Sequence, residues 1–323
     1  MAIKRKVKRS ESADMISLNT AFDDFISEKE ATNKSPATVR SYKKTYKKFC
    51  DKFGEIEDTQ QVTQKLFFKW SQSMLNEGLS PESINHYLRD MRTFMNWCMK
   101  DERQYTTPFK VELVSSQQNP PKFYTTEEQQ ALIRRPSKKA DYCEWRSWAI
   151  CNFILATGAR TSSIINLQMK DIDLKKKKIT YSHTKNKEAQ IIPMSSKLQS
   201  VLKEYIRIWR AEATEDDYLF SNIGERQLSD NALRIAFRKY AEDRDVNKTS
   251  IHGLRHTFAR EFILNDGSMI KLQRLLGHSS LEMTRRYIKL FAEDIEEGFD
   301  DINPLDNLGK SSSRKKTIKR AYD

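Results

Sequence analysis

Hydrophobic residues recur three and four positions apart through the first third of the chain, the spacing that gathers side chains on one face of a helix. Two of the predicted helices open on a Ser-Pro pair, at Ser35-Pro36 and Ser80-Pro81, where the serine can cap the helix and the proline fits its first turn. The predicted helices span 15–30, 36–53, 63–76 and 81–98. We therefore expect residues 14–107 to form one compact four-helix domain.

The pattern changes in residues 171–193. Residues 179–183 and 189–193 are predicted as two strands around a Lys-Asn-Lys-Glu turn, the one clear β-hairpin in the sequence. Helical spacing returns on both sides of the hairpin, and the predicted helices span 148–157, 162–169, 196–211, 229–242, 252–264, 268–275 and 281–297. The expected fold is mainly α, with a small antiparallel β-hairpin or sheet in the second domain.

The segment 108–124 contains three prolines and little periodicity, so it is the predicted linker. A Thr-Thr-Glu-Glu capping pattern then opens a second domain, expected to span 125–300. Both ends of the chain are polar and basic, and we expect them to be tails, at residues 1–13 and 301–323.

Composition agrees with two folded domains. A chain of 323 residues fits about two domains of ~100–200 residues each, and 38% hydrophobic residues are enough to build their cores. No run of ~18 apolar residues predicts a membrane span, and the N-terminus lacks the apolar stretch of a secretory signal. The four cysteines form no CxxC pair, which favours reduced, buried thiols in a cytoplasmic protein.

The formal charge of +13 is concentrated at the ends of the chain. Residues 1–10 and 310–320 together carry eleven Lys and Arg and no acid, so the rest of the chain carries only +2. A basic tail is compatible with a polyanionic partner and equally with a solvated end. Net charge therefore does not establish nucleic-acid binding, and the basic helix faces of the first domain are open to the same two interpretations.

The side chains that could take part in catalysis gather in the segments 157–160, 183–187, 252–256 and 276–278, the last followed by Tyr287. Two arginines, a lysine, two histidines and a tyrosine are the candidates among them, and no carboxylate cluster accompanies them, so a hard-metal site is not expected. Guanidinium groups match phosphate oxygens, and a lysine can protonate a departing alkoxide. Nearby cations favour a phenolate, and histidine can accept its proton. The set suits metal-free attack on a phosphodiester through a covalent phosphotyrosine.

These segments resemble the tyrosine recombinase (phage integrase) family, which includes the chromosome-dimer resolvases. The resemblance runs from about residue 15 to about residue 300 and is most specific at 252–256, at 276–278 and in the nine-residue step from His278 to Tyr287. It implies a two-domain, C-shaped clamp around double-stranded DNA and a homotetramer on paired DNA sites in the cytoplasm, at the nucleoid. It implies no metal or other cofactor, and accessory DNA-bending or directionality proteins are compatible with it.

The resemblance assigns six catalytic residues by position: Arg160, Lys185, His252, Arg255, His278 and Tyr287. The two arginines would hold the scissile phosphate, and the second histidine would hydrogen-bond to it. The hairpin lysine would be the general acid for the 5′-hydroxyl, and the first histidine would be the general base. The tyrosine would be the nucleophile, leaving a 3′-phosphotyrosyl link.

Two positions complicate this assignment. Ser163 stands where many family members carry an acidic residue that supports neighbouring groups of the site. Its absence puts the fine tuning of those groups in doubt, but not the chemistry. Lys187 competes with Lys185 for the hairpin role, and the distance to Pro193 favours Lys185.

Simpler interpretations exist for single residues. His252 and His256 are four apart, a spacing that can ligate zinc, but Gly253 stands where the expected glutamate would be and no third ligand is evident. His256 is instead expected to be a structural residue. Tyr287 also fits an ordinary apolar stripe, and Arg160 alone would pass for a surface cation. The catalytic interpretation rests on the joint occurrence of all six residue types in family order.

The predicted function is a site-specific DNA recombinase, for integration and excision of a mobile element or for Xer-type resolution. The alternatives are a non-catalytic, sequence-specific DNA-binding protein of the same fold and a type IB topoisomerase. With a DNA clamp implied, the outward basic residues of the first domain become candidate DNA contacts: Arg40, Lys43, Lys44, Arg89 and Arg92.

Overall fold

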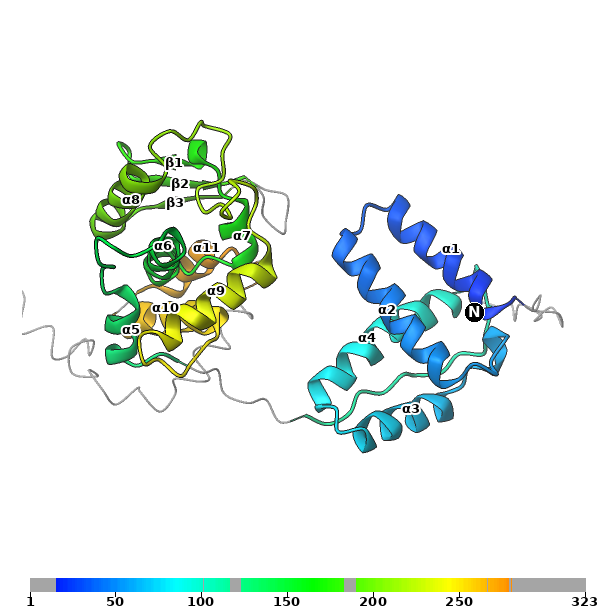
Figure 1. Ribbon diagram of the computed structural model, residues 1–323. Coiled ribbons are helices and arrows are strands. Elements are labelled where there is room, and N and C mark those ends of the chain that lie inside the picture. Colours follow the sequence, from blue (N-terminus) through cyan, green and yellow to red (C-terminus); the bar gives the residue numbers. More distant parts are fainter. Residues whose placement is uncertain are drawn as a thin grey trace, which may run out of the picture. The chain divides into compact units, whose positions relative to one another are not determined.

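The computed structural model describes residues 16–100, 102–116, 123–182, 190–265, 267–278 and 280. The chain divides into two compact units, Met1–Asn119 and Pro120–Asp323, each considered by itself (Figure 1). The division falls within the expected linker, 108–124. Both predicted tails, the predicted helix 281–297, and the predicted residues Lys185, Lys187 and Tyr287 lie outside the described residues.

Four α-helices build the described part of the first unit: α1 (Leu18–Ala31), α2 (Pro36–Lys52), α3 (Gln64–Asn76) and α4 (Pro81–Cys98). Both Ser-Pro pairs begin helices as predicted. Ser35 Oγ accepts a hydrogen bond from the Thr38 amide, and Ser80 Oγ accepts one from the Ser83 amide. The core is rich in aromatic side chains, and Phe25, Phe49 and Trp70 are at most 1% exposed.

The chain after α4 folds back on the first unit. Val111 is buried, and the Asn85 side chain exchanges two 2.8 Å hydrogen bonds with the backbone of Val114. This return changes one prediction, because Arg92 does not face outward. Its side chain is half-buried, and its guanidinium donates a hydrogen bond to the Val111 carbonyl. The covering segment turns what looked like a solvent face of α4 into a packed one.

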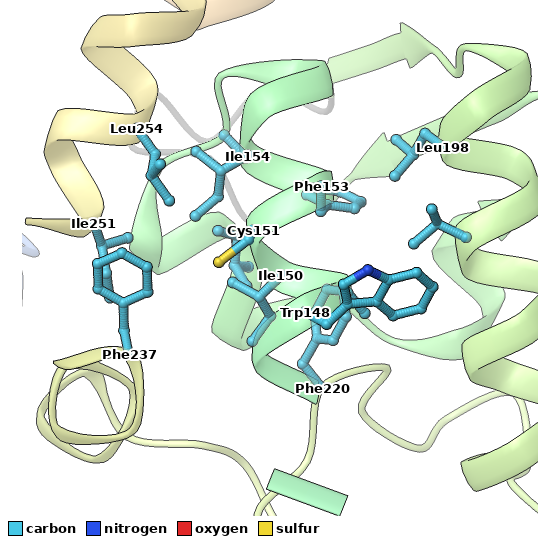
Figure 2. Packing of buried hydrophobic residues seen from close by; sticks show 14 of the residues in the cluster. Trp148, Ile150, Cys151, Phe153, Ile154, Leu198, Phe220, Phe237, Ile251 and Leu254 are labelled. Carbon is cyan, nitrogen blue, oxygen red and sulfur yellow. The ribbon is translucent and has the colours of Figure 1, made fainter. Parts of the chain in front are cut away.

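Seven α-helices build the described part of the second unit: α5 (Thr126–Ile133), α6 (Tyr142–Thr157), α7 (Thr161–Asn166), α8 (Ser196–Trp209), α9 (Asp230–Glu242), α10 (Ile251–Leu264) and α11 (Met269–Leu276). Helix α6 is the centre of the core, since every residue from Trp145 to Ile154 is buried. Figure 2 shows its side chains packed among Leu198 of α8, Phe237 of α9 and Leu254 of α10. A helix that is buried all round lacks an amphipathic period, and for this reason its first turns escaped prediction.

The hairpin is part of a three-stranded antiparallel sheet in the order β1 (Ile172–Asp173), β2 (Lys178–Tyr181) and β3 (Gln190–Pro193). The predicted fold class is confirmed: the chain is mainly helical, with a small antiparallel sheet in the second unit. The additional strand β1 follows a short 3₁₀ helix, Met169–Asp171, and two residues are too few to show a strand period in the sequence.

All four cysteines are free, and two of them, Cys98 and Cys151, are buried as expected. Cys50 and Cys143 are only half-buried. Within the described ranges, the structure contains no helix that is both long and apolar enough to cross a membrane.

Candidate active site

Arg160 lies directly after the turn that ends α6. The helix ends at Gly158, whose φ of +64° is left-handed, and a Cβ there would lie 2.7 Å from a Leu276 side-chain atom. Only glycine meets both conditions without strain. The turn leaves Arg160 at the N-cap position of α7, half-buried, with its Nη2 donating to the Gly277 carbonyl at 3.1 Å.

Arg255 lies on α10 and is only 3% exposed. Its Nη1 donates to the Gly158 carbonyl at 2.6 Å, and its Nη2 donates to the Leu276 carbonyl at 2.9 Å. Both acceptors are carbonyls at helix C-termini, which lack intrahelical partners and carry the partial negative end of the helix dipole. The ends of α6 and α11 therefore hold this buried cation in place.

The same turn at the end of α11 binds both arginines. Gly277 has a left-handed φ of +59°, and the amide of His278 closes the turn by donating to the Gln273 carbonyl at 3.1 Å. The consecutive carbonyls of Leu276 and Gly277 accept from Arg255 and Arg160, respectively. Two side chains that are distant in sequence thereby converge on one turn, immediately before His278.

His278 is in direct contact with the second guanidinium. Its Nε2 lies 3.0 Å from Arg255 Nη2, and because a guanidinium only donates, this ring nitrogen is the acceptor. Desolvation lowers the pKa of His278 to about 4, and the nearby charges of Arg255 and Arg160 contribute. The imidazole is therefore neutral at pH 7, with its proton on Nδ1.

His252 lies in the first turn of α10, on an exposed face. The pKa of its imidazole is lowered by desolvation and then by Arg255 and Arg160. The start of this helix is fixed by Ser250, whose Oγ accepts from the Gly253 amide at 3.1 Å. A neutral histidine beside two guanidiniums is chemically able to accept a proton.

His256 packs edge to face against His252, with ring centroids 4.4 Å apart. It is half-buried, and desolvation lowers the pKa of His256 to about 4. Across the described residues, no group of three or more His, Cys, Asp or Glu side chains is placed to hold a metal ion.

Two polar residues near the sheet were missed by the sequence interpretation: Gln190, the first residue of β3, and Asp171, the last residue of the 3₁₀ helix before β1. Gln190 donates from Nε2 to the carbonyls of Arg274 and Leu275 in the last turn of α11, and Asp171 accepts from Ser182 Oγ at 2.9 Å. The strand period could have placed Gln190 on the inward face, because it stands two positions before the inward-facing Ile192 of β3.

Ser163 lies in the first turn of α7 and is half-buried. It lines a narrow recess with Asp171, Tyr181 and Ser182, so Asp171 brings a carboxylate to the region of Ser163.

The candidate DNA contacts lie in the first unit. Arg40 and Lys44 on α2 and Arg89 on α4 are exposed. Lys43 is also exposed and forms a 3.1 Å ion pair with Glu30. Only Arg92 of the five is turned inward, as described above.

Comparisons with known proteins cover both units. The sequence profile of the Phage integrase family matches residues 122–294, and that of the phage integrase N-terminal SAM-like domain matches residues 21–105. The chain is 28% identical over 279 residues to tyrosine recombinase XerC of Thermodesulfovibrio yellowstonii, covering 84% of this chain and 91% of the relative. It is 24% identical over 275 residues to tyrosine recombinase XerD of Halalkalibacterium halodurans, covering 83% and 91%.

Two solved structures share the fold. The Tn1549 transposon integrase in complex with transposon right end DNA matches with a TM-score of 0.70 at 18% identity, covering 84% of this chain and 94% of that one. A lambda integrase dimer bound to a COC′ core site matches with a TM-score of 0.65 at 16% identity, covering 85% and 78%.

Proposed function

The chain belongs to the phage integrase family and is a tyrosine recombinase, an enzyme that cleaves and rejoins DNA, and from this premise we propose which of its residues perform the reaction. Arg160, Arg255 and His278 form the phosphate-binding part of the active site. His252 completes the described part as the general base. Lys185 and Tyr287 supply the general acid and the nucleophile.

One observation carries the assignment: two guanidiniums and a neutral imidazole meet at the turn that ends α11. A phosphodiester carries one negative charge over two non-bridging oxygens, which guanidinium forks match in shape and charge. The helix-terminal carbonyls orient both forks, and preorganised donors of this kind stabilise a transition state with more charge on the phosphoryl oxygens.

The reaction begins when the Tyr287 phenolic oxygen attacks the scissile phosphorus. His252 accepts the phenolic proton, because the depressed pKa of its imidazole keeps it neutral at pH 7. The bond between phosphorus and the 5′-oxygen breaks, and Lys185 protonates that oxygen as it leaves. The product is a 3′-phosphotyrosyl ester and a free 5′-hydroxyl. A 5′-hydroxyl from another strand reverses these steps and reseals the backbone, so the ester conserves the bond energy.

The substrate of this proposal is double-stranded DNA. Relatives of the same fold were solved with transposon-end DNA and with a phage core site. We place four copies of this chain on two DNA sites, with accessory DNA-bending or directionality proteins as further partners. The proposed biological role is integration and excision of a mobile element or resolution of chromosome dimers, in the cytoplasm at the nucleoid. The exposed candidates for backbone contacts are Arg40, Lys43, Lys44 and Arg89.

Covalent trapping tests the function. Purified protein is incubated with fragmented genomic DNA from its source, and the fragments that remain bound after denaturation are sequenced to find the target. A nicked suicide substrate is then built on that target. Wild-type protein is expected to form a DNA adduct, and Tyr287→Phe to form none. Equal adduct formation by the variant would show that Tyr287 is not the nucleophile.

The alternatives give different results in the same experiment. A non-catalytic DNA-binding protein shifts the target site in a gel without forming an adduct. A type IB topoisomerase relaxes supercoiled plasmid as a monomer and without sequence preference.

A further inference from the structure

The side chain of Tyr124 is tied to the start of α10. Tyr124 stands two residues before α5 and is only 3% exposed. Its phenolic O–H lies 3.0 Å from the carbonyl oxygens of both Lys248 and Ser250 and donates its single proton to them. Ser250 is the residue that caps α10, since its Oγ accepts from the Gly253 amide. The phenol therefore holds the backbone from which this helix begins.

The backbone of Tyr124 is tied to the same helix a second time. Its amide donates to Thr257 Oγ1 at 2.9 Å, and the Thr257 hydroxyl donates to the Gly253 carbonyl at 2.9 Å. Thr257 is fully buried, so its hydroxyl satisfies polar backbone groups that water does not reach. A third tie comes from α5, where Glu128 accepts from Lys248 Nζ at 2.7 Å.

These contacts enclose the first turn of α10, which carries His252. Ser250, just before the turn, is held directly by the phenol, and Gly253 is held through the threonine hydroxyl. Among the described residues, the His252 imidazole has no hydrogen bond or ion pair, and its one ring contact is with His256. The place of this imidazole is therefore set mainly by the backbone of the turn.

We propose that Tyr124 is a positioning residue for His252: it fixes the first turn of α10 at both ends and so places the imidazole that accepts the phenolic proton of Tyr287. The proposal rests on the proposed function, because that function makes His252 the general base. Arg255 on the same helix is held separately by the carbonyl ends of α6 and α11. Loss of the Tyr124 contacts is therefore expected to act on the base rather than on phosphate binding.

A double-mutant cycle in the adduct assay tests the proposal. Tyr124→Phe keeps the ring and removes only the hydroxyl. It is expected to form adduct about 10- to 100-fold more slowly at pH 7, the loss typical of a catalytic group misplaced by about 1 Å. His252→Ala should be at least as slow, because it removes the base altogether. The double variant should be no slower than His252→Ala, since no imidazole is left to position.

The pH profile of adduct formation is a second readout. Without a general base, the reaction depends on the ionised form of Tyr287. For a phenol with a pKa of ~10, this form becomes about 100-fold more abundant between pH 7 and pH 9. The deficits of Tyr124→Phe and His252→Ala relative to wild type should therefore shrink over this range, whereas that of Arg255→Ala should remain.

The groups around His252 keep their charge over the same range. The two guanidiniums stay protonated, and the pKa values of His256 and His278 are about 4, so both rings stay neutral. Burial raises the pKa of Tyr124 above its ordinary value, so its hydroxyl keeps its proton. The profile thus reports on the base and the nucleophile.

Tyr240→Phe is the matched control. Tyr240 is also 3% exposed, and its phenol donates to the Leu132 carbonyl at 2.7 Å, away from the start of α10. This variant should lose stability in urea as Tyr124→Phe does, but form adduct at the wild-type rate.

A second pair of variants addresses the other tie. Thr257→Val removes the hydroxyl that joins the Tyr124 amide to the Gly253 carbonyl, and it should behave like Tyr124→Phe in the cycle. Thr257→Ser keeps the hydroxyl and should restore the rate. Urea unfolding identifies any variant that fails to fold, and if Tyr124→Phe does so, the two Thr257 variants decide.

Losses that multiply in the double variant, or that persist undiminished at pH 9, would overturn the proposal, since they would show that Tyr124 acts on folding or on phosphate binding. An unchanged rate in Tyr124→Phe, or an equal loss in Tyr240→Phe, would overturn it as well. If the wild-type protein forms no adduct, or if His252→Ala is as fast as wild type, the proposed function itself has failed, which is a different result.

Discussion

The two units bury different kinds of side chain. The first unit fills its core with rings such as Phe25, Phe49 and Trp70, which contact neighbours on adjacent helices. The second unit also has a large apolar core, but beside it a guanidinium is buried against the carbonyl ends of two helices. The first unit can be stabilised by any well-packed set of apolar side chains, whereas the chemistry of the second depends on fixed backbone geometry.

The largest effect is expected when the planar guanidinium of the buried Arg255 is replaced. Arg255→Lys keeps the charge but cannot donate in parallel to the Gly158 and Leu276 carbonyls. We expect adduct formation to fall about 100- to 1,000-fold, the loss typical of a misplaced charge-stabilising donor. The matched change Arg40→Lys, at an exposed candidate backbone contact of the first unit, should alter the rate little, because lysine keeps the charge that attracts a phosphate. Similar losses in both variants would contradict the contrast between the units.

A pair of glycines separates strain from packing. Gly158 and Gly78 both have a left-handed φ, of +64° and +78°, but a Cβ has no neighbour within 4 Å at Gly78 and meets Leu276 at Gly158. Gly78→Ala should lower the free energy of unfolding by about 1–2 kcal/mol, the cost of the backbone conformation. Gly158→Ala should add an overpacking cost of about 1–3 kcal/mol. Urea unfolding measures the difference, and equal losses would show that the turn relaxes around the methyl group.

Two helix caps make a smaller and more selective comparison. Ser80 caps α4 in the first unit, and Ser250 caps α10, which carries His252 and Arg255. Each Ser→Ala variant should lose about 1 kcal/mol of stability, as measured by urea unfolding. Only Ser250→Ala should also slow adduct formation, because the first turn of α10 then frays beside the phosphate. A slower reaction with Ser80→Ala would instead point to coupling between the units.

The smallest expected effect is a dependence of stability on pH that arises in the second unit. His256 and His278 have pKa values near 4 in the folded protein, below the ordinary value of 6.5, so the unfolded chain binds more protons between these limits. Stability is therefore fully present above pH 6.5 and decreases as the pH falls toward 4. Urea midpoints at pH 7 and pH 5 should show a modest loss. His256→Gln should reduce that loss.

The sequence was a good guide wherever the signal was local. The Ser-Pro pairs marked the first residues of α2 and α4 because capping depends on residues three positions apart. The apolar stripes marked the remaining helices of the first unit for a similar reason. The four described catalytic candidates were found through motif order, and the same order predicted Lys185 and Tyr287, which lie outside the described residues.

Contacts between distant segments were beyond the reach of periodicity. Arg160 and the Gly277 carbonyl are 117 positions apart, and their hydrogen bond exists only once α7 and α11 have packed. Arg92 was predicted to face outward because the segment that covers it follows α4 in the chain. Gln190 and Asp171 were missed because their partners are backbone carbonyls and a serine hydroxyl, which no motif records.

The pair of carbonyls at the end of α11 has a consequence for the energetics of DNA binding. Free arginine side chains have many rotamers, and ordering one on binding costs about 0.5–1.5 kcal/mol. Here the restriction of Arg160 and Arg255 takes place during folding, since both are already hydrogen-bonded to the helix end. The incoming phosphate therefore meets side chains that have little conformational entropy left to lose, and more of its interaction energy remains for affinity and for the reaction.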